Sequence, residues 1–345
     1  MRVLQVMAGA AHGGAELFFE RLTIALGRAG VQQRAVIRAQ PERSARLRGA
    51  GIECVELPFG GPFDWRTTPA LKREIANYQP DIALAWMSRA AQKLPRHRPR
   101  DSRPIICARL GGYYPLKYYR NCDHLIGNTR GILEHLLYAG WPASRSHYLP
   151  NFADPTIAPA VPRAQFSTPD AAPLLLAMGR LHDNKGFDVL LEALGKVPPA
   201  YLWIAGEGPL EAELKKISTQ LGVADRVRFL GWRDDGPALL AAADMLVCPS
   251  RVEPLGNVVI EAWAHHRPVV ATRSDGPAAL IRHGDNGLLE NIDDPDGLAH
   301  SITQLIEKPE YARQIAANGY AAYAEQFTEA AVVQAYIEFF DRIAV

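Results

Sequence analysis

Two glutamates, Glu253 and Glu261, stand eight residues apart in a segment that reads as strand, loop and helix. Apolar residues 245–248 predict the strand. A helix that begins near Gly256 would leave Glu253 in the loop and Glu261 over a turn inside the helix. The free backbone amides at this helix start, from Leu255 to Val258, would point at an anion. The two carboxylates would then face different parts of one elongated ligand.

A second loop carries two cations. The sequence GRLHDNKG, at residues 179–186, follows the apolar strand-like run at 174–178. Arg180 offers a planar fork of donors, and Lys185, five residues later, offers a compact positive charge. This pair suits a diphosphate better than a single phosphate. The alternative is a surface loop with two solvated cations.

A glycine-rich loop, GAAHGGAE at residues 9–16, follows the first predicted strand. Gly13 and Gly14 would let the backbone approach a ligand, and the start of the next helix would favour an anion. The loop is not G-x-G-x-x-G, and Arg38, rather than an acidic residue, ends the second apolar run. Both features disfavour a dinucleotide-binding dehydrogenase. A plain tight turn before a helix is the alternative for this loop.

These loops join short apolar runs that alternate with helical segments, which is typical of parallel sheets covered by helices. The alternation breaks in the Pro- and Ala-rich residues 151–172, which read as a linker between two α/β domains. Because such sheets bind ligands at the carboxyl ends of their strands, the loops after the strands should hold the site. The predicted strands lie at residues 3–7, 35–38, 54–57, 82–87, 105–110, 124–128, 174–178, 202–205, 227–230, 245–248 and 269–272.

Charge is distributed unevenly along the chain. Residues 1–150 contain 22 Lys and Arg against 11 Asp and Glu, whereas residues 151–345 contain 16 against 26. A basic half suggests contact with an anionic membrane or a phosphorylated glycolipid, and its densest stretch is residues 96–103. That stretch has a solvated surface loop as its alternative. The chain lacks an aromatic-interleaved basic motif or zinc module, which disfavours nucleic acid.

The cysteines and the N-terminus indicate a reducing compartment. The four cysteines lack pairing spacing, and three lie in apolar strand-like runs, so buried free thiols are expected. The short apolar start reads as a strand rather than a signal peptide, and no run approaches the roughly 18 apolar residues of a membrane span. The sequence thus predicts a cytoplasmic protein, with a possible peripheral position on the inner face of the cytoplasmic membrane.

Several motifs taken in order resemble the retaining glycosyltransferases of family 4, also called glycosyl transferases group 1, which have the GT-B fold. They are GRLHDNKG, WIAGEGP, RFLGW, Glu-x7-Glu and PSRVEPLGNVVIEAWAHHRPVVAT, within residues 174–305, with looser matches at GGAE and YLPN. The resemblance implies two Rossmann-like, doubly wound domains that face each other across a cleft. The first, residues 1–160, would bind the acceptor. The second, residues 170–328, would bind the nucleotide sugar, and a C-terminal helix, residues 329–345, would pack back on the first.

The resemblance also implies roles for individual residues. Arg180 and Lys185 would stabilise the leaving diphosphate, and Glu261 would bind the ribose hydroxyls. Glu253 would contact the donor sugar, so Glu253, Arg180 and Lys185 are the expected catalytic residues. The other expected donor-binding residues are Gly13, Gly14, Trp232, Leu255, Gly256 and Asn257.

One departure from the family concerns the sugar. Many members have a histidine after a strand in the middle of the N-terminal domain, where this chain reads CARLGGYY. Arg109 is the expected occupant, and His12, His97 or His124 would be substitutes. The resemblance favours a front-face substitution in which the leaving phosphate oxygen takes the acceptor proton. No Asp-x-Asp site follows a strand, so no metal and no other cofactor is expected.

The predicted function is therefore transfer of a hexose from a nucleotide-diphosphate sugar to a glycan or glycolipid acceptor. A lipid-linked or lipopolysaccharide-core acceptor is favoured because the first half is basic. A sugar-nucleotide epimerase on the same fold is one alternative, although its carboxylate and base triad is not identifiable. A two-domain sugar-binding protein without enzymatic activity is another. The sequence leaves the donor's base and sugar open.

Overall fold

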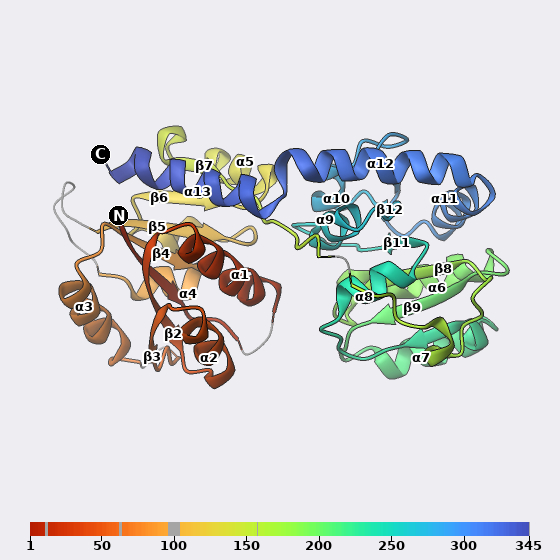
Figure 1. Cartoon of the computed structure of the whole chain (residues 1–345), viewed down its shortest axis with the longest axis horizontal. Helices are drawn as coiled ribbons and strands as arrows, with labels where there is room; N and C mark the ends of the chain where they lie inside the picture. Colours follow the sequence, from red (N-terminus) through yellow and green to blue (C-terminus); the bar gives the residue numbers. More distant parts are fainter. Residues whose placement is uncertain (11–12, 62–63, 96–103, 157, 345) are drawn as a thin grey trace. The chain divides into compact units, whose positions relative to one another are not determined.

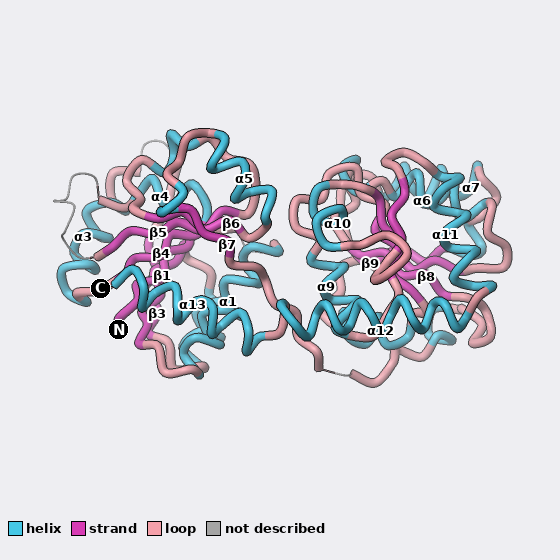
Figure 2. The backbone as a smooth tube through the Cα atoms, turned by 90° about the horizontal axis from the view of Figure 1, so that it is seen from above, coloured by secondary structure: helices cyan, strands magenta, loops and turns pink. Residues whose placement is uncertain are grey.

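The computed structural model describes residues 1–10, 13–61, 64–95, 104–156 and 158–344. The chain divides into two compact units (Figure 1). The first comprises Met1–Asn151 and Glu329–Val345, and the second comprises Phe152–Thr328. The first unit therefore contains both ends of the chain, which lie near each other in Figures 1 and 2.

The first unit is built on seven parallel strands in the order β3-β2-β1-β4-β5-β6-β7. Strand β4 is buried along its whole length, and β1 and β5 are buried beyond their first residue, as expected for a parallel sheet with helices on both faces. The strands are β1 Arg2–Met7, β2 Gln32–Arg38, β3 Glu53–Leu57, β4 Ile82–Trp86, β5 Ile105–Leu110, β6 His124–Gly127 and β7 Ser146–Tyr148. The helices are α1 Gly14–Arg28, α2 Pro41–Gly49, α3 Thr67–Tyr78, α4 Met87–Lys93, α5 Arg130–Tyr138 and α13 Glu329–Ala344, with 3-10 turns η1 Leu116–Tyr119 and η2 Ala143–Arg145.

The second unit repeats this architecture with six parallel strands in the order β10-β9-β8-β11-β12-β13. The strands are β8 Leu174–Met178, β9 Tyr201–Ala205, β10 Val227–Phe229, β11 Met245–Cys248, β12 Val269–Thr272 and β13 Leu288–Glu290. The helices are α6 Phe187–Gly195, α7 Glu211–Gln220, α8 Gly236–Ala242, α9 Asn257–Ala264, α10 Asp275–Leu280, α11 Pro295–Glu307 and α12 Pro309–Gln326, with 3-10 turns η3 Arg163–Phe166, η4 Asp183–Lys185 and η5 Ala224–Arg226.

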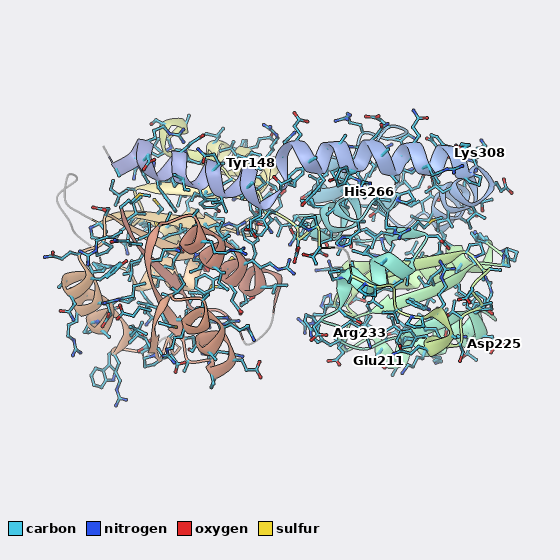
Figure 3. All side chains as sticks on the ribbon, in the orientation of Figure 1. Tyr148, Glu211, Asp225, Arg233, His266 and Lys308 are labelled. Carbon is cyan, nitrogen blue, oxygen red and sulfur yellow. The ribbon has the colours of Figure 1, made fainter. Side chains whose placement is uncertain are left out.

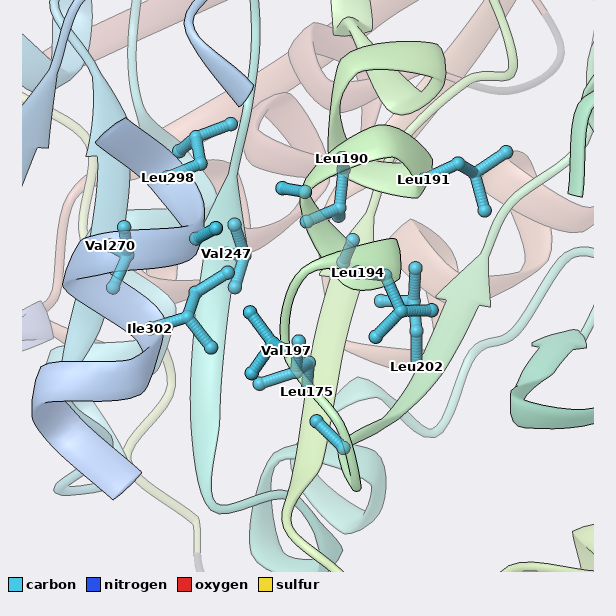
Figure 4. Close-up of a cluster of buried hydrophobic side chains, with 14 of the residues drawn as sticks. Leu175, Leu190, Leu191, Leu194, Val197, Leu202, Val247, Val270, Leu298 and Ile302 are labelled. Atoms are coloured by element: carbon cyan, nitrogen blue, oxygen red, sulfur yellow. The ribbon is translucent and has the colours of Figure 1, made fainter. Parts of the chain in front are cut away.

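Two apolar clusters cover the two faces of the second sheet. In one, Leu190 and Leu194 of α6 and Ile302 of α11 pack with Leu175 and Val247 of the strands (Figure 4). In the other, Trp263 of α9 and Tyr323 of α12 belong to the opposite face. Figure 2 shows the strands of each unit enclosed by helices. The rigid sheet fixes where the loops after its strands begin.

The two Rossmann-like parallel sheets confirm the expected fold class. The predicted runs at 105–110, 174–178, 245–248 and 269–272 coincide with β5, β8, β11 and β12. The short edge strands β7 and β13 were not predicted. At the end of β7, the ring of Tyr148 (labelled in Figure 3) lies beneath the guanidinium of Arg130.

The first unit ends at Asn151, whereas the expected boundary was residue 160. The residues that follow bond to the second unit, because the Ala153 amide donates to Phe327 O at 3.2 Å and its carbonyl accepts from Tyr323 Oη at 3.1 Å. All four cysteines lie among the described residues; they are buried and form no disulfide, as expected. Within the part of the chain that the structure describes, no helix is long and apolar enough to cross a membrane.

Candidate active site

The loops that carry the predicted donor residues meet at one point of the second sheet. Strands β8 and β11 are neighbours, and the strand order runs outward from them in opposite directions. Open parallel sheets bind ligands at such a switch point, outside the carboxyl ends of the strands. Residues 179–186 follow β8 and residues 249–256 follow β11, and the amide of Val252 donates to Asn184 O at 3.0 Å. The two loops thus form one unit of structure at this edge.

Glycines allow these loops to pack backbone against backbone. Gly186 has a φ of +61°, and a side-chain carbon there would collide with the carbonyl oxygen of Pro249. Carbons added at Gly206 and Gly208, which follow β9, would collide with the carbonyl oxygens of Gly179 and Leu181. The turn WIAGEGP was part of the sequence resemblance, but its role as a support for the cationic loop was not predicted.

Glu253 lies at the centre of this arrangement and is 8% exposed. One carboxylate oxygen forms an ion pair with Lys185 Nζ. The other accepts from the amide of Gly256 at 3.2 Å and lies 3.4 Å from the amide of Leu255. Gly256, with a φ of +68°, is the N-cap of α9. The structure therefore brings together four predicted site residues around a carboxylate at the start of a helix, where backbone amides favour negative charge.

Arg251 fastens the neighbouring segments together. Its guanidinium donates to the carbonyl of Asp183 at 2.9 Å, to both carboxylate oxygens of Asp188 at 2.9 and 2.6 Å, and to Asp293 at 2.6 Å. Hydrogen bonding to Asp188 raises the pKa of Arg251. Burial acts to raise the pKa of Asp188, but the hydrogen bonds and charge of Arg251 outweigh burial and lower it. This role of Arg251 was not predicted, because its three partners are distant along the chain.

The remaining predicted donor residues lie around the same edge. Arg180 is exposed, and no hydrogen bond or ion pair joins it to the described residues. Asn257 is the first residue of α9, and Glu261 is half-buried within that helix. Trp232 is 61% exposed, and its amide donates to Glu207 Oε1 at 3.3 Å. Their contacts with a ligand stay predictions.

In the first unit, Gly13 is the N-cap of α1 and Gly14 is its first residue. The loop before them is held at Ala10, whose amide donates to Glu16 Oε1 at 2.8 Å and whose carbonyl accepts from Arg43 Nη1 at 3.2 Å. His12, His97 and the basic residues 96–103 lie outside the described residues. The predicted approach of Gly13 and Gly14 to a donor stays a prediction.

Arg109 occupies the core of the first unit, where it is 1% exposed. Its Nε donates to Tyr336 Oη of α13 at 2.9 Å, and its Nη2 donates to Asn151 Oδ1. The guanidinium carbon lies 4.7 Å from the ring centre of Phe18 and 5.0 Å from that of Trp86. Arg109 thus joins β5, the end of the first segment and α13. Its expected contact with a sugar stays a prediction.

His124 of β6 lies beside His147 of β7, with 3.0 Å between Nδ1 and Nε2. Both rings contact Phe339 of α13. Burial lowers the pKa of His147 to about 4, aided by the charges of His124 and Arg342. Burial also lowers the pKa of His124, with Arg145 adding to the effect. These neighbours place His124 in the packing of α13 against the sheet.

At this edge of the second sheet, two cations and the amides at the start of α9 can bind anionic groups. The carboxylates of Glu253 and Glu261 can accept hydrogen bonds from hydroxyl groups. A family model described as glycosyl transferases group 1 matches residues 172–308, the segment that contains this edge.

Similarity to known proteins extends over the whole chain. It is 37% identical over 338 residues to the lipopolysaccharide core biosynthesis glycosyltransferase LpsE of Rhizobium meliloti (strain 1021), covering 94% of this chain and 95% of the relative. It is also 34% identical over 353 residues to the lipopolysaccharide core biosynthesis glycosyltransferase LpsD of the same organism, covering 99% of this chain and 98% of that relative. The crystal structure of Anabaena Alr3699/HepE in complex with UDP has a TM-score of 0.85 at 23% identity, covering 99% of this chain and 100% of that one. The chain belongs to the group 1 glycosyltransferases and has their GT-B fold.

Proposed function

We propose that this glycosyltransferase transfers a hexose from a nucleotide-diphosphate sugar to a lipopolysaccharide-core acceptor, with retention of configuration. The observation that carries the proposal is the meeting of Lys185, Glu253 and the start of α9 at the switch point of the second sheet, where the loop after β8 also carries the exposed Arg180. The relatives LpsE and LpsD are named for lipopolysaccharide core biosynthesis. Anabaena HepE is described in complex with UDP and with UDP-glucose, so a UDP sugar is the first donor to test.

In the proposed reaction the donor diphosphate lies between Arg180, Lys185 and the amides at the start of α9. These positive groups stabilise the negative charge that grows on the leaving phosphate. The Lys185–Glu253 pair opens as the donor binds, so that Lys185 turns to the phosphate and Glu253 to the sugar hydroxyls. Glu261 accepts hydrogen bonds from the ribose hydroxyls, and Trp232 lies near the base.

Retention follows if the acceptor hydroxyl attacks from the face that the diphosphate leaves. The departing phosphate oxygen then accepts the acceptor's proton, and no second carboxylate at hydrolase spacing is required. The cations of the protein take the place that a metal would have at the diphosphate, so we propose a reaction without a metal or other cofactor.

We also propose a cytoplasmic enzyme that makes peripheral contact with anionic membrane through its first unit. That unit carries 23 Lys and Arg against 14 Asp and Glu, whereas the second carries 15 against 23. A basic surface gains about 1 kcal/mol per Lys or Arg near an anionic bilayer and loses it as salt screens the charges. Cosedimentation with phosphatidylglycerol vesicles at low salt, and its loss at high salt, is the expected result.

Thermal-shift titration tests the donor site. A nucleotide that binds only the folded protein raises the melting temperature. At a nucleotide concentration of 100 times Kd, it adds about 2.7 kcal/mol to the free energy of unfolding. We expect stabilisation by UDP that is lost in Arg180→Ala and Glu261→Ala and kept in Lys196→Ala, whose exposed lysine pairs with Asp296. Failure of UDP, GDP and ADP alike to stabilise the wild type would contradict the proposed site.

A further inference from the structure

Three unusual residues lie side by side on the first sheet. Met87, Gly111 and Asn128 each directly follow a strand, β4, β5 and β6 respectively. These strands are neighbours, and their carboxyl ends point to the same edge. A side-chain carbon built on Gly111 would lie 3.2 Å from Met87 Sδ and 3.8 Å from Asn128 Nδ2. The three residues therefore form one locus at the carboxyl ends of these strands, beginning at β4, one of the two strands of the switch point where open parallel sheets bind ligands.

The Asn128 carboxamide is buried and has no hydrogen-bond partner among the described residues. The residue is 4% exposed, and neither Oδ1 nor Nδ2 makes a hydrogen bond with the rest of the described chain. Most buried polar side-chain atoms are paired, because each unpaired group costs about 1–3 kcal/mol. Asn128 is not needed to cap α5, since Thr129 Oγ1 already accepts the amide of Ile132 at 3.1 Å.

Backbone strain occurs at the same place. Met87 has a φ of +65°, in the left-handed region that unbranched non-glycine residues adopt at a cost of about 1–3 kcal/mol. Its flexible thioether side chain lies against Gly111, beside the amide of Asn128. A methionine adapts its shape easily, so it can cover the amide in the free protein and turn aside for a ligand.

We propose that Asn128 is a specificity-determining contact for hydroxyl groups of the acceptor sugar, reached when the Met87 side chain turns aside. A carboxamide both donates and accepts, which matches a pair of hydroxyls, whereas a phosphate would leave Oδ1 unpaired. The assignment to the acceptor rests on the proposed function, in which the second unit holds the donor diphosphate. Gly111 keeps the approach open because any side chain there would press on Met87.

The test is Asn128→Leu, with transfer from UDP-glucose to a truncated lipopolysaccharide core as the assay. Removing an unpaired buried amide should leave the melting temperature unchanged or raise it. The acceptor KM should rise about 2- to 10-fold for each hydrogen bond lost, while the KM for UDP-glucose and the thermal shift with UDP stay as in the wild type. Asn128→Ser, which retains a hydroxyl, should recover part of the acceptor affinity.

Thr23→Val is the matched control. Thr23 of α1 is 0% exposed, and its hydroxyl likewise has no hydrogen-bond partner in the described chain. The Thr23→Val variant should have a melting temperature that is unchanged or raised, as expected for Asn128→Leu, and its acceptor KM should be that of the wild type.

Two results would overturn the assignment of Asn128. One is an unchanged acceptor KM for Asn128→Leu at any melting temperature; a lower melting temperature would then make the amide structural. The other is a rise in the KM for UDP-glucose alone, which would place the locus with the donor. A wild type that transfers to no truncated core would instead contradict the proposed function, and with it the acceptor that the assignment requires.

Discussion

At the scale of single residues, the Lys185–Glu253 pair shows how the loops of the proposed donor site are held together by their own charges. The carboxylate of Glu253 fills the positive environment formed by the lysine and the start of α9. An anion that enters this environment competes with Glu253 for the same donors. The Glu253 carboxylate thus occupies the position proposed for the diphosphate. Binding of the diphosphate would exchange one set of charge-assisted hydrogen bonds for another.

Lys185→Ala should reduce kcat by about 100- to 1000-fold, the usual effect of removing one donor that stabilises a developing negative charge. Stability should change by only about 1 kcal/mol, because Glu253 keeps its bonds to the helix amides. Steady-state kinetics with UDP-glucose, together with urea unfolding, measure the two effects. Lys196→Ala should change neither, and a Lys185→Ala enzyme with normal kcat would remove Lys185 from the catalytic set.

Arg109→Lys should destabilise the protein by about 1–3 kcal/mol, because an ammonium cannot reproduce the planar fork that reaches Tyr336 and Asn151 together. Tyr336→Phe removes one of these partners and should cost about 1 kcal/mol alone. In a double-mutant cycle measured by urea unfolding, the double variant should lose less unfolding free energy than the sum of the two single losses. Strict additivity would mean that the pair does not couple α13 to β5.

At the scale of elements, the glycine contacts determine whether the cationic loop can sit on its neighbours. Gly186 and Gly222 have similar left-handed φ values, +61° and +67°, but only Gly186 faces another backbone. Gly222→Ala should therefore cost about 1–2 kcal/mol for the conformation alone. Gly186→Ala should cost more than this and should also weaken the thermal shift with UDP. Equal losses in the two variants would show that backbone packing is unimportant there.

The contact of α13 with β6 and β7 should make stability depend on pH. The pKa of His147 is about 4 in the folded protein, against an ordinary value of 6.5. Between these values the unfolded chain binds more protons, so stability is full above about pH 6.5 and falls as the pH drops toward 4. Urea unfolding at pH 7 and pH 5 should show a smaller difference in His147→Gln than in the wild type. His300→Gln, at an exposed histidine of α11, should behave as the wild type.

The sequence predicted those elements best whose signal is local. Apolar runs located β5, β8, β11 and β12 to the residue, because buried parallel strands are continuously apolar. Strands β7 and β13, with three residues each, were missed and form at the sheet edges by pairing with a neighbour, whereas the equally short edge strand β10 was predicted at 227–230. The chemistry of Lys185 and Glu253 was visible in motifs, but their ion pair, the Arg251 bonds and the burial of Arg109 depend on partners far away in sequence.

At the scale of the whole molecule, the two units differ in continuity. Both apolar clusters of the second unit lie within residues 152–328. The first unit needs α13, whose Val332, Tyr336, Phe339 and Phe340 are buried. We expect residues 152–328 alone to unfold cooperatively and to respond to UDP, and residues 1–151 alone to lack a cooperative transition.

A permuted first unit provides the control for this prediction. Residues 329–345 joined by a Gly-Ser linker to residues 1–151 should regain cooperative unfolding, because the two termini lie near each other (Figures 1 and 2). Circular dichroism during heating measures all three proteins. If residues 1–151 unfold as cooperatively as the permuted form, α13 is dispensable for the first unit.

Because α13 belongs to the first unit, that unit cannot be completed during translation until the second unit has been synthesised. The first 151 residues leave the ribosome early, but the helix that supplies Tyr336 to Arg109 and Phe339 to the two histidines is translated only after residues 152–328. Synthesis of the intervening unit takes about 9 to 35 seconds at about 5–20 residues per second. Throughout that interval we expect the apolar face that α13 covers to stay exposed, and the emergence of α13 to bury it.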